Sequence, residues 1–509
     1  MLPSSLFWNR VLWGLWLVLA LLAWPAVAGA SDTPVADPTV ACRVAGIKTE
    51  VRCGQLLRAL DPARPGGPQI TVHYVVLRSV ARNRKPDPVF MLAGGPGQSA
   101  IGLAAAVLPW FERLLLQRDL VLVDQRGTGK SAPLMCPPPP RLPFGSASAQ
   151  AQAQELAQCR AALERLPYIS RPSDLGFFTT TLAMQDLDAV RQALGATQIN
   201  VVGASYGTRA ALEYMRQFGP HVRRSVLDGV APPDMVLPTT LGPDSQAALD
   251  ALWASCRASS PCQQAFPALA AEWQSLWQSL PQSVTLAHPL TGQLLQVSVT
   301  REAVMGAVRG ALYTPAIAAA LPQAVHDAAQ GRFEGLAGLE SALQNGAPHL
   351  RLALGMHLGV VCAEDYPRMP TAAGTPPDST DPQTQYRSAC RDWPQGAVPA
   401  DFYRIPPAQH ATLLLSGGID PVTPARHAQR ALQALGPLAR HVLVPQAGHG
   451  ILSHACMHKV LTAFIQASDD AQALAVDARC AQSIPRPLAF VRPTVAAAQG
   501  HHDSYRQSI

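Results

Sequence analysis

The sequence predicts an α/β fold with a mostly parallel sheet, and three observations support that prediction. Short apolar runs alternate with helical patterns from about residue 70 to residue 230. The same alternation resumes beyond residue 405. A glycine-flanked serine also stands where one strand-like run turns into a helix-like run. Alternating strands and helices favour parallel pairing, because each crossover helix returns the chain to the same end of the sheet.

Individual strands are predicted from short β-branched or wholly apolar runs bounded by turn residues. Apolar residues at helical spacing also predict three helices in the sheet region, over 180–194, 208–218 and 456–465. The sheet is therefore expected to begin in the first half of the chain and to be completed near its end. The predicted strands fall at 71–78, 88–92, 120–123, 198–202, 224–227, 412–415 and 442–444.

A large insertion is predicted between the two parts of the sheet. Far more residues separate Ser205 from Asp420 than the roughly thirty that a strand–helix–strand unit needs. Helical patterns with proline-rich breaks between them predict a mostly helical cap over residues 235–405, inserted before the strand that carries Asp420. These patterns lie at 265–280, 301–312 and 316–329.

Composition limits the class of protein. A chain of 509 residues, 48% of them hydrophobic, can bury a large core, and 47 prolines predict long stiff loops. The net charge of +6 is not gathered into a run of lysines and arginines interleaved with aromatic residues. No nucleic-acid partner is therefore expected.

The first thirty residues have the layout of a secretory signal. Arg10 is followed by an apolar stretch over 11–24, which is short for a membrane span, and then by two overlapping Ala-x-Ala sites within residues 26–30. We expect a signal peptide over 1–30 and an exported protein, periplasmic or secreted, with no stable membrane association after cleavage. The rest of the chain is predicted to divide into the first part of the core over 31–234, the cap over 235–405, the second part of the core over 406–485 and a C-terminal tail over 486–509.

Ten cysteines follow the predicted signal, an even number that suggests disulfides in an exported chain. Pairing each with its neighbour in sequence would give five short loops, although sequence alone leaves the connectivity open. No C-x-x-C motif and no histidine cluster at ligand spacing occurs, so no metal and no other cofactor is expected. The candidate disulfide residues are Cys42, Cys53, Cys136, Cys159, Cys256, Cys262, Cys362, Cys390, Cys456 and Cys480.

Ser205 is the candidate nucleophile. It lies in Gly203-Ala204-Ser205-Tyr206-Gly207, between a predicted strand and a predicted helix, where a sharp turn presents the serine hydroxyl outward. The flanking glycines allow neighbouring backbone to approach without Cβ clashes. The alternative interpretation is a solvated serine in an ordinary loop.

A serine hydroxyl needs an imidazole base and a carboxylate that orients the imidazole. Asp420 follows the strand predicted at 412–415, and His449 stands in a glycine-flanked loop after the last predicted strand. This order of serine, aspartate and histidine is typical of α/β-hydrolases. Asp228 is the rival acid, and His454 and His458, near the last helix, are the rival bases.

Acyl transfer also needs N–H donors for the oxyanion. The backbone N–H of Tyr206, which follows the nucleophile, is one candidate. The other is the N–H of Gly95 in the turn Gly94-Gly95-Pro96-Gly97, whose glycines let the backbone approach a substrate carbonyl.

Together with the motif Asp124-Gln125-Arg126-Gly127-Thr128-Gly129-Lys130-Ser131, these segments resemble the proline iminopeptidase and secreted tripeptidyl aminopeptidase group of α/β-hydrolases. The matching segments run from about 70 to 230 and from 350 to 485. The resemblance implies a serine exopeptidase acting on peptides with free N-termini, with Ser205 as nucleophile, His449 as base and Asp420 as orienter. It also implies a C-terminal region similar to the TAP-like domain. Ala93 departs from the group, which usually has histidine before the two glycines.

An aminopeptidase must bind an ammonium group, and a carboxylate in the cleft is the expected partner. Glu364 and Asp365 are the candidates, because they follow an apolar stretch expected to lead from the cap to the sheet. A solvated helix end is the alternative. Thr423, three positions after Asp420, is a candidate for hydrogen bonding to that carboxylate or its loop.

Two other functions stay open at this point. A carboxylesterase or amidase can use the same scaffold, because fold and triad do not select the acyl group. A non-catalytic periplasmic binding protein on the same fold is the third possibility. The number of residues released, the side-chain preference and the oligomeric state are not readable from the sequence.

Overall fold

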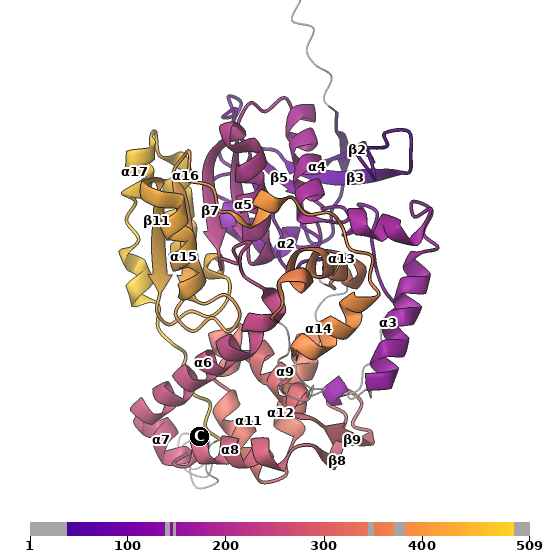
Figure 1. The fold of residues 1–509 in the computed structure, drawn as a ribbon. Coiled ribbons are helices and arrows are strands. Elements are labelled where there is room, and N and C mark those ends of the chain that lie inside the picture. The colour runs from indigo at the N-terminus through magenta and orange to yellow at the C-terminus, as the bar shows by residue number, and fades with distance from the viewer. Residues whose placement is uncertain (1–37, 138–142, 146–148, 345–350, 371–381, 493–509) are drawn as a thin grey trace, which may run out of the picture. The chain divides into compact units, whose positions relative to one another are not determined.

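A mixed sheet forms the upper part of the computed structural model, and a group of helices forms the lower part (Figure 1). The structure describes residues 38–137, 143–145, 149–344, 351–370 and 382–492, so the predicted signal peptide lies outside the described residues. The described helices and strands belong to one unit, Thr39–Ile509. Within the described residues its main sheet has nine strands, namely β1 (Val40–Cys42), β2 (Val51–Ala59), β3 (Gln69–Leu77), β4 (Val89–Leu92), β5 (Leu120–Val123), β6 (Ile199–Ala204), β7 (Val222–Asp228), β10 (Thr412–Gly417) and β11 (Ala439–Val444).

The strand order is β1-β2-β3-β5-β4-β6-β7-β10-β11. The pairs β1·β2, β2·β3 and β3·β5 are antiparallel, and the other pairs are parallel. Ala204 and Leu415 both pair with Asp228, so the carboxyl ends of β6, β7 and β10 lie at one level. The loops after these strands therefore meet at one edge of the sheet, which is where α/β proteins place their sites.

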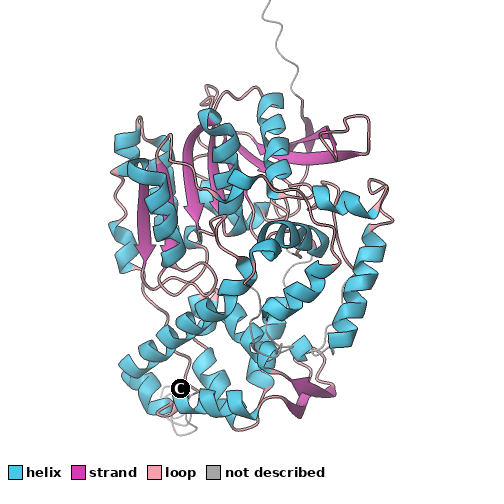
Figure 2. Ribbon diagram, in the orientation of Figure 1, coloured by secondary structure: helices cyan, strands magenta, loops and turns pink. Residues whose placement is uncertain are grey.

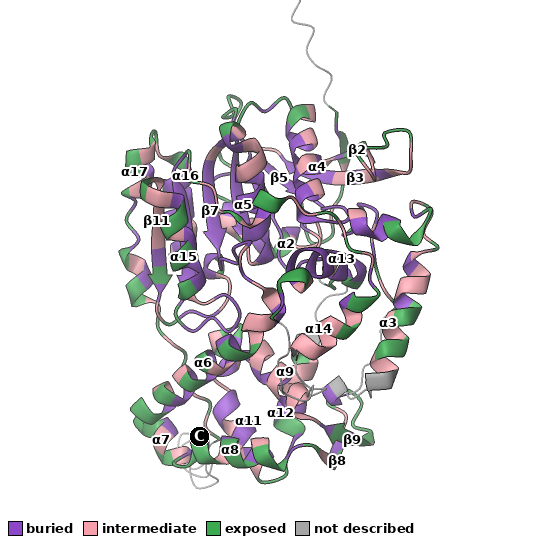
Figure 3. Cartoon of the chain, viewed as in Figure 1, coloured by how far each residue is buried: buried purple, intermediate pink, exposed green. Residues whose placement is uncertain are grey.

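Alternate residues of the central strands pack against helices on opposite faces of the sheet. Phe90 and Val201 belong to a core that includes residues of α4, α5 and α15, whereas Met91 and Val202 belong to a second core with α2 and α16. The strands are buried on both sides (Figure 3), which explains their continuous apolar runs. The helices of this region are α2 (Ala104–Phe111), α3 (Ala149–Leu163), α4 (Thr180–Ala193), α5 (Tyr206–Phe218), α15 (Ala425–Leu435), α16 (Ala455–Gln466) and α17 (Asp470–Leu474).

The insertion between β7 and β10 is mostly helical, as predicted (Figure 2). It has its own core, in which the rings of Trp253, Trp273 and Trp277 pack together. A hairpin of β8 (Gln282–Ala287) and β9 (Leu294–Val299) was not expected, and the helix predicted over 316–329 is divided into two. The helices are α6 (Leu237–Ala258), α7 (Ser260–Ala265), α8 (Leu269–Ser279), α9 (Arg301–Leu312), α10 (Pro315–Ala318), α11 (Leu321–Ala329), α12 (Glu334–Gln344), α13 (Leu354–Val360) and α14 (Pro382–Arg391).

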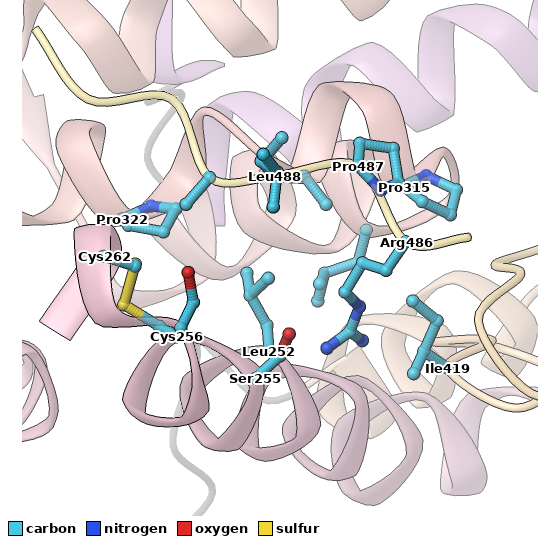
Figure 4. Close-up of a pocket in the computed structure, with 15 residues that line it drawn as sticks. Leu252, Ser255, Cys256, Cys262, Pro315, Pro322, Ile419, Arg486, Pro487 and Leu488 are labelled. Atoms are coloured by element: carbon cyan, nitrogen blue, oxygen red, sulfur yellow. A yellow bond between two sulfur atoms is a disulfide. The ribbon is translucent and has the colours of Figure 1, made fainter.

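The end of the described chain lies against the cap (Figure 4). The Arg486 guanidinium points into a cavity of about 70 Å³ beside α6, where its Nη1 donates to the Ala251 carbonyl at 3.0 Å. Further on, the Phe490 N–H donates to the Ala319 carbonyl at 2.8 Å. Residues 485–492 therefore form a strap over the cap.

Each cysteine is joined to its neighbour in sequence. The five disulfides are Cys42–Cys53, Cys136–Cys159, Cys256–Cys262, Cys362–Cys390 and Cys456–Cys480.

Among the described residues, none of the helices is long and apolar enough to cross a membrane.

Candidate active site

Ser205 occupies the turn between β6 and α5 with φ 56° and ψ −125°, a backbone conformation that costs energy for any residue but glycine. The turn is possible because Gly203 and Gly207, two positions before and after Ser205, have no side chains. A Cβ on Gly203 would lie 2.3 Å from the Gly207 carbonyl oxygen, and one on Gly207 would lie 2.2 Å from the Leu92 carbonyl oxygen. The glycines therefore let the turn sit tightly against β4, and Ser205 stays partly exposed.

His449 and Asp420 meet at the ends of β10 and β11. Asp420 Oδ2 lies 2.8 Å from His449 Nδ1. Because an ionised carboxylate only accepts hydrogen bonds, Nδ1 carries the imidazole proton and Nε2 is left as the basic nitrogen. The opposite oxygen, Asp420 Oδ1, accepts the N–H groups of Val422 at 2.9 Å and Thr423 at 2.8 Å, and the Thr423 hydroxyl donates to Oδ2 at 2.8 Å. Four donors thus fix the carboxylate.

The electrostatics of this pair favour its charged form. Burial alone lowers the pKa of His449, but the charge and hydrogen bond of Asp420 and the charge of Asp228 outweigh it, so the pKa of His449 is raised. For Asp420, burial acts to raise the pKa, and His449 and the backbone donors outweigh it, so the pKa is lowered. Asp420 is thus suited to stabilise an imidazolium on His449.

Ser205 and His449 approach each other across the end of β7. The Ser205 N–H donates to the Asp228 carbonyl at 2.8 Å, and a Cβ on the next residue, Gly229, would lie 3.0 Å from His449 Cε1. Within the described residues, the Ser205 hydroxyl makes no hydrogen bond, to His449 or to any other group. Hydrogen bonds between a nucleophile and its base are often long without substrate and tighten when it binds.

Asp228, the rival acid, serves the backbone instead. Its carboxylate accepts the N–H groups of Ile451 at 2.8 Å and Leu452 at 2.9 Å, and burial raises its pKa to about 6. Of the rival bases, His458 bonds through Nε2 to the Leu452 carbonyl at 2.8 Å. Asp228 therefore braces the loop that presents His449.

Two backbone N–H groups next to Ser205 or in the adjoining loop have no backbone carbonyl partner within the described residues. Tyr206 begins α5, so its N–H has no carbonyl from a preceding helical turn. The Gly95 N–H donates to no backbone carbonyl of the described chain. A Cβ on Gly94 would lie 3.0 Å from Ser205 Cβ, so this loop runs directly beside the nucleophile.

The loop after β4 is held by Asp124, at the end of β5. Its carboxylate accepts the Ser99 hydroxyl at 2.6 Å and the Ile101 N–H at 3.1 Å. A Cβ on Gly129 would lie only 1.9 Å from Asp124 Oδ2. These contacts explain the motif from Asp124 to Ser131. The turn that contains Gly129 packs around the Asp124 carboxylate, and that carboxylate fixes the glycine-rich loop after β4.

Glu364 and Asp365 are buried rather than solvated, in a π-helical turn over Val361–Asp365. Asp365 pairs with Arg209 at 3.0 Å, and Glu364 accepts the N–H of Thr180 at 2.8 Å and its hydroxyl at 3.0 Å. The Thr180 hydroxyl also lies 2.7 Å from the Tyr206 hydroxyl. A ligand ammonium would have to displace these donors, so the structure gives no support to an amine-binding role. The network instead anchors Tyr206.

Sequence reasoning missed two residues that the cap brings to the site. The Tyr313 carbonyl, just after α9, accepts the His449 N–H at 2.9 Å, and its ring lies edge-on to the imidazole at 5.0 Å. Leu352 lies against the loop after β4, 3.1 Å from where a Cβ on Gly95 would stand. Both side chains remain well exposed, at 39% and 44%. No local pattern marks either residue, because only the fold of the insertion places them there.

The described part of the chain holds no group of three histidine, cysteine, aspartate or glutamate side chains that could bind a metal ion.

A strained serine turn, a buried histidine–aspartate pair and a parallel sheet with an inserted cap define a class of protein, and a family comparison agrees. The family model described as "alpha/beta hydrolase fold" matches residues 87–453. The chain belongs to this family.

Several characterised relatives are similar over part of the chain. Tripeptidyl aminopeptidase of Streptomyces lividans is 31% identical over 192 residues, which cover 36% of each chain. Serine protease Hip1 of Mycobacterium tuberculosis is 30% identical over 190 residues, again 36% of each. Carboxylesterase B of Mycobacterium tuberculosis is 31% identical over 244 residues, or 42% of this chain and 45% of the relative. The similarity thus spans less than half the length of each relative.

Proposed function

We propose that this protein is an exported serine aminopeptidase, of the tripeptidyl or prolyl type, that hydrolyses short peptides through Ser205, His449 and Asp420. The observation that supports the proposal best is the 2.8 Å contact between His449 Nδ1 and Asp420 beside a serine held at φ 56°. Two of the relatives are named as an aminopeptidase and a serine protease, which favours peptides as substrates. The five disulfides and the signal-like N-terminus favour export.

The mechanism follows from the positions of the side chains. His449 Nε2 removes the hydroxyl proton as Ser205 Oγ attacks the scissile carbonyl, and Asp420 stabilises the imidazolium that forms. The N–H groups of Tyr206 and Gly95 bind the oxyanion. His449 then protonates the leaving amine, the acyl-enzyme forms, and a water activated by the same imidazole hydrolyses it.

A carboxylesterase is the second candidate, because one similar relative carries that name. The same three side chains cleave either bond, so the distinction depends on what binds the rest of the substrate. We also propose that the chain divides functionally as predicted, with a cap over 235–405 on a core of 31–234 and 406–485.

Substitution of the nucleophile tests the proposal. Ser205→Ala is expected to keep the wild-type melting temperature and to lose hydrolysis of tripeptidyl-naphthylamides by at least about 10³-fold, because the variant lacks the hydroxyl that attacks the carbonyl. Comparing free-amine with blocked substrates, and amides with esters, separates the two candidates. Retained activity in Ser205→Ala would contradict the nucleophile, and cleavage of blocked esters alone would favour the esterase.

A further inference from the structure

A cavity of about 620 Å³ lies between α3, α13 and α14. None of the residues assigned to the triad or the oxyanion hole lines it. Its size falls within the roughly 300–1,000 Å³ usual for small-molecule sites. Leucines supply much of its wall: Leu156, Leu352, Leu354 and Leu358. Leu352 and Leu354 are 44% and 41% exposed, which is unusual for large apolar side chains beside a well-packed core.

One residue of the cavity wall contacts the loop after β4, which runs beside Ser205. Leu352 is the side chain that lies against Gly95. His357, also in the wall, has Nδ1 3.1 Å from the Pro96 carbonyl oxygen and Nε2 2.8 Å from the Tyr386 hydroxyl. Because a carbonyl only accepts, Nδ1 carries the proton and Tyr386 donates to Nε2. Burial lowers the pKa of His357, which keeps this imidazole neutral. The wall next to the oxyanion loop is therefore apolar or uncharged.

One carboxylate faces this uncharged wall. Glu155, on α3, is the one acidic side chain among the described residues that line the cavity, and no described residue forms an ion pair with it. Glu155 is only half-buried, so its carboxylate stays accessible to a cation that enters the cavity. By contrast, Asp365 already pairs with Arg209, and Glu364 already accepts a hydrogen bond from Thr180.

We propose that this cavity binds the N-terminal part of a peptide with apolar side chains, and that Glu155 pairs with the α-ammonium group. The inference rests on the proposed function, since it names the substrate class of the same site. The scissile carbonyl would lie at Gly95 and Tyr206, and the apolar side chains would pack on Leu352 and Leu354. Three extended residues span only about 10 Å, so the distance from Glu155 to the loop would limit how many residues are released.

Glu155→Gln tests the ammonium pairing, because it keeps the shape of the side chain and removes its charge. We would measure kcat/KM for Ala-Leu-Leu-aminomethylcoumarin and for its N-acetylated form. The ratio of free to acetylated substrate is expected to fall at least about tenfold in Glu155→Gln and to be largely restored in Glu155→Asp. Glu164→Gln is the matched control, because Glu164 follows the same helix, pairs with Arg160 and lies outside the cavity wall. Its ratio should equal that of the wild type.

Leu354→Ala tests the apolar wall in the same assay. Its kcat/KM for Ala-Leu-Leu-aminomethylcoumarin, relative to Ala-Ala-Ala-aminomethylcoumarin, is expected to fall about fivefold or more. Unchanged ratios in both Glu155→Gln and Leu354→Ala would overturn the inference. Hydrolysis of p-nitrophenyl acetate, compared between wild type and Ser205→Ala, separates this failure from failure of the proposed function. If that ester reaction depends on Ser205 while the peptide ratios stay constant, only the cavity assignment is wrong.

Discussion

At the scale of single residues, the partners of His449 determine when its imidazole can act as a base. Asp420 and Asp228 raise the pKa of His449 above its ordinary value of 6.5, and only the neutral imidazole can accept the Ser205 proton. We therefore expect kcat/KM to fall as pH decreases through a value above about 6.5. Asp420→Asn removes the neighbouring charge, so its acid limb should lie at lower pH.

The same substitution should lower kcat by about 10³–10⁴-fold, because the amide can stabilise the wrong imidazole tautomer. pH–rate profiles of the wild type and of Asp420→Asn, measured with one amide substrate, check both effects. A profile whose acid limb does not move would show that Asp420 does not control the ionisation of His449. Asp228→Asn is the comparison: it also removes a charge that raises the pKa of His449, but Asp228 binds two backbone N–H groups rather than the imidazole, so the acid limb should move less.

At the scale of elements, the π-helical turn that carries Glu364 connects the cap region to the nucleophile. Thr180, at the start of α4, bridges the Glu364 carboxyl and the Tyr206 hydroxyl, and Tyr206 begins α5. Three elements thus meet below the serine turn. A charged carboxylate is costly there, although Arg209 lies 3.6 Å from it.

This arrangement predicts a pH-dependent stability. Burial raises the pKa of Glu364 from 4.5 to about 7, so the folded protein holds this proton more tightly than the unfolded chain. Glu364 therefore contributes most to the free energy of unfolding below about pH 4.5. This contribution, up to about 3 kcal/mol, is lost as pH rises towards 7. Glu364→Gln stays neutral and should lose less stability between about pH 5 and about pH 8. Urea unfolding at the two pH values checks this, and equal losses would contradict it.

The sequence was informative where one element carries its own signal. The buried parallel strands are continuous apolar runs, so their positions were predicted to within a few residues. Ser205, Asp420 and His449 each follow such a run. The hairpin of β8 and β9 was missed because its strands are mostly exposed or partly buried and contain polar residues, so they lack the continuous apolar run of the central strands. Glu364 was predicted as a carboxylate in the cleft, with a solvated helix end as the alternative, because the sequence does not reveal that Arg209, far earlier in the chain, is its neighbour.

At the scale of the whole molecule, the candidate site depends on segments that meet only after the insertion has folded. Gly95 and Ser205 come from the first part of the core, Asp420 and His449 from the second, and Tyr313 from the cap. The N–H of His449 donates to Tyr313, so the cap holds a loop of the core directly. Tyr313 and Leu352 have no sequence signature for this reason, since their role depends on how 235–405 packs. Any element that fixes the cap should therefore influence activity.

The strap is such an element, and its removal should loosen the cap. It bonds to the cap through Arg486 and Phe490, and Arg492 pairs with Asp327 of α11 at 3.0 Å. Truncation after Ile484 removes all three contacts but leaves the Cys456–Cys480 disulfide. We expect a loss of about 1–3 kcal/mol in unfolding free energy, faster proteolysis within 235–405 and lower kcat/KM.

Arg479→Ala is the control for the truncation, because Arg479 pairs with the nearby Asp477 at the exposed surface, and its loss should leave the unfolding free energy almost unchanged. Thermal unfolding, limited proteolysis and peptide hydrolysis measure the three effects of the truncation. If the strap only covers the cap, stability alone should fall while kcat/KM stays constant in the folded protein. A joint fall in kcat/KM and in protease resistance would instead mean that the cap must be held in place for Tyr313 to support His449, because the hydrogen bond between them is a direct link from the cap to the proposed base.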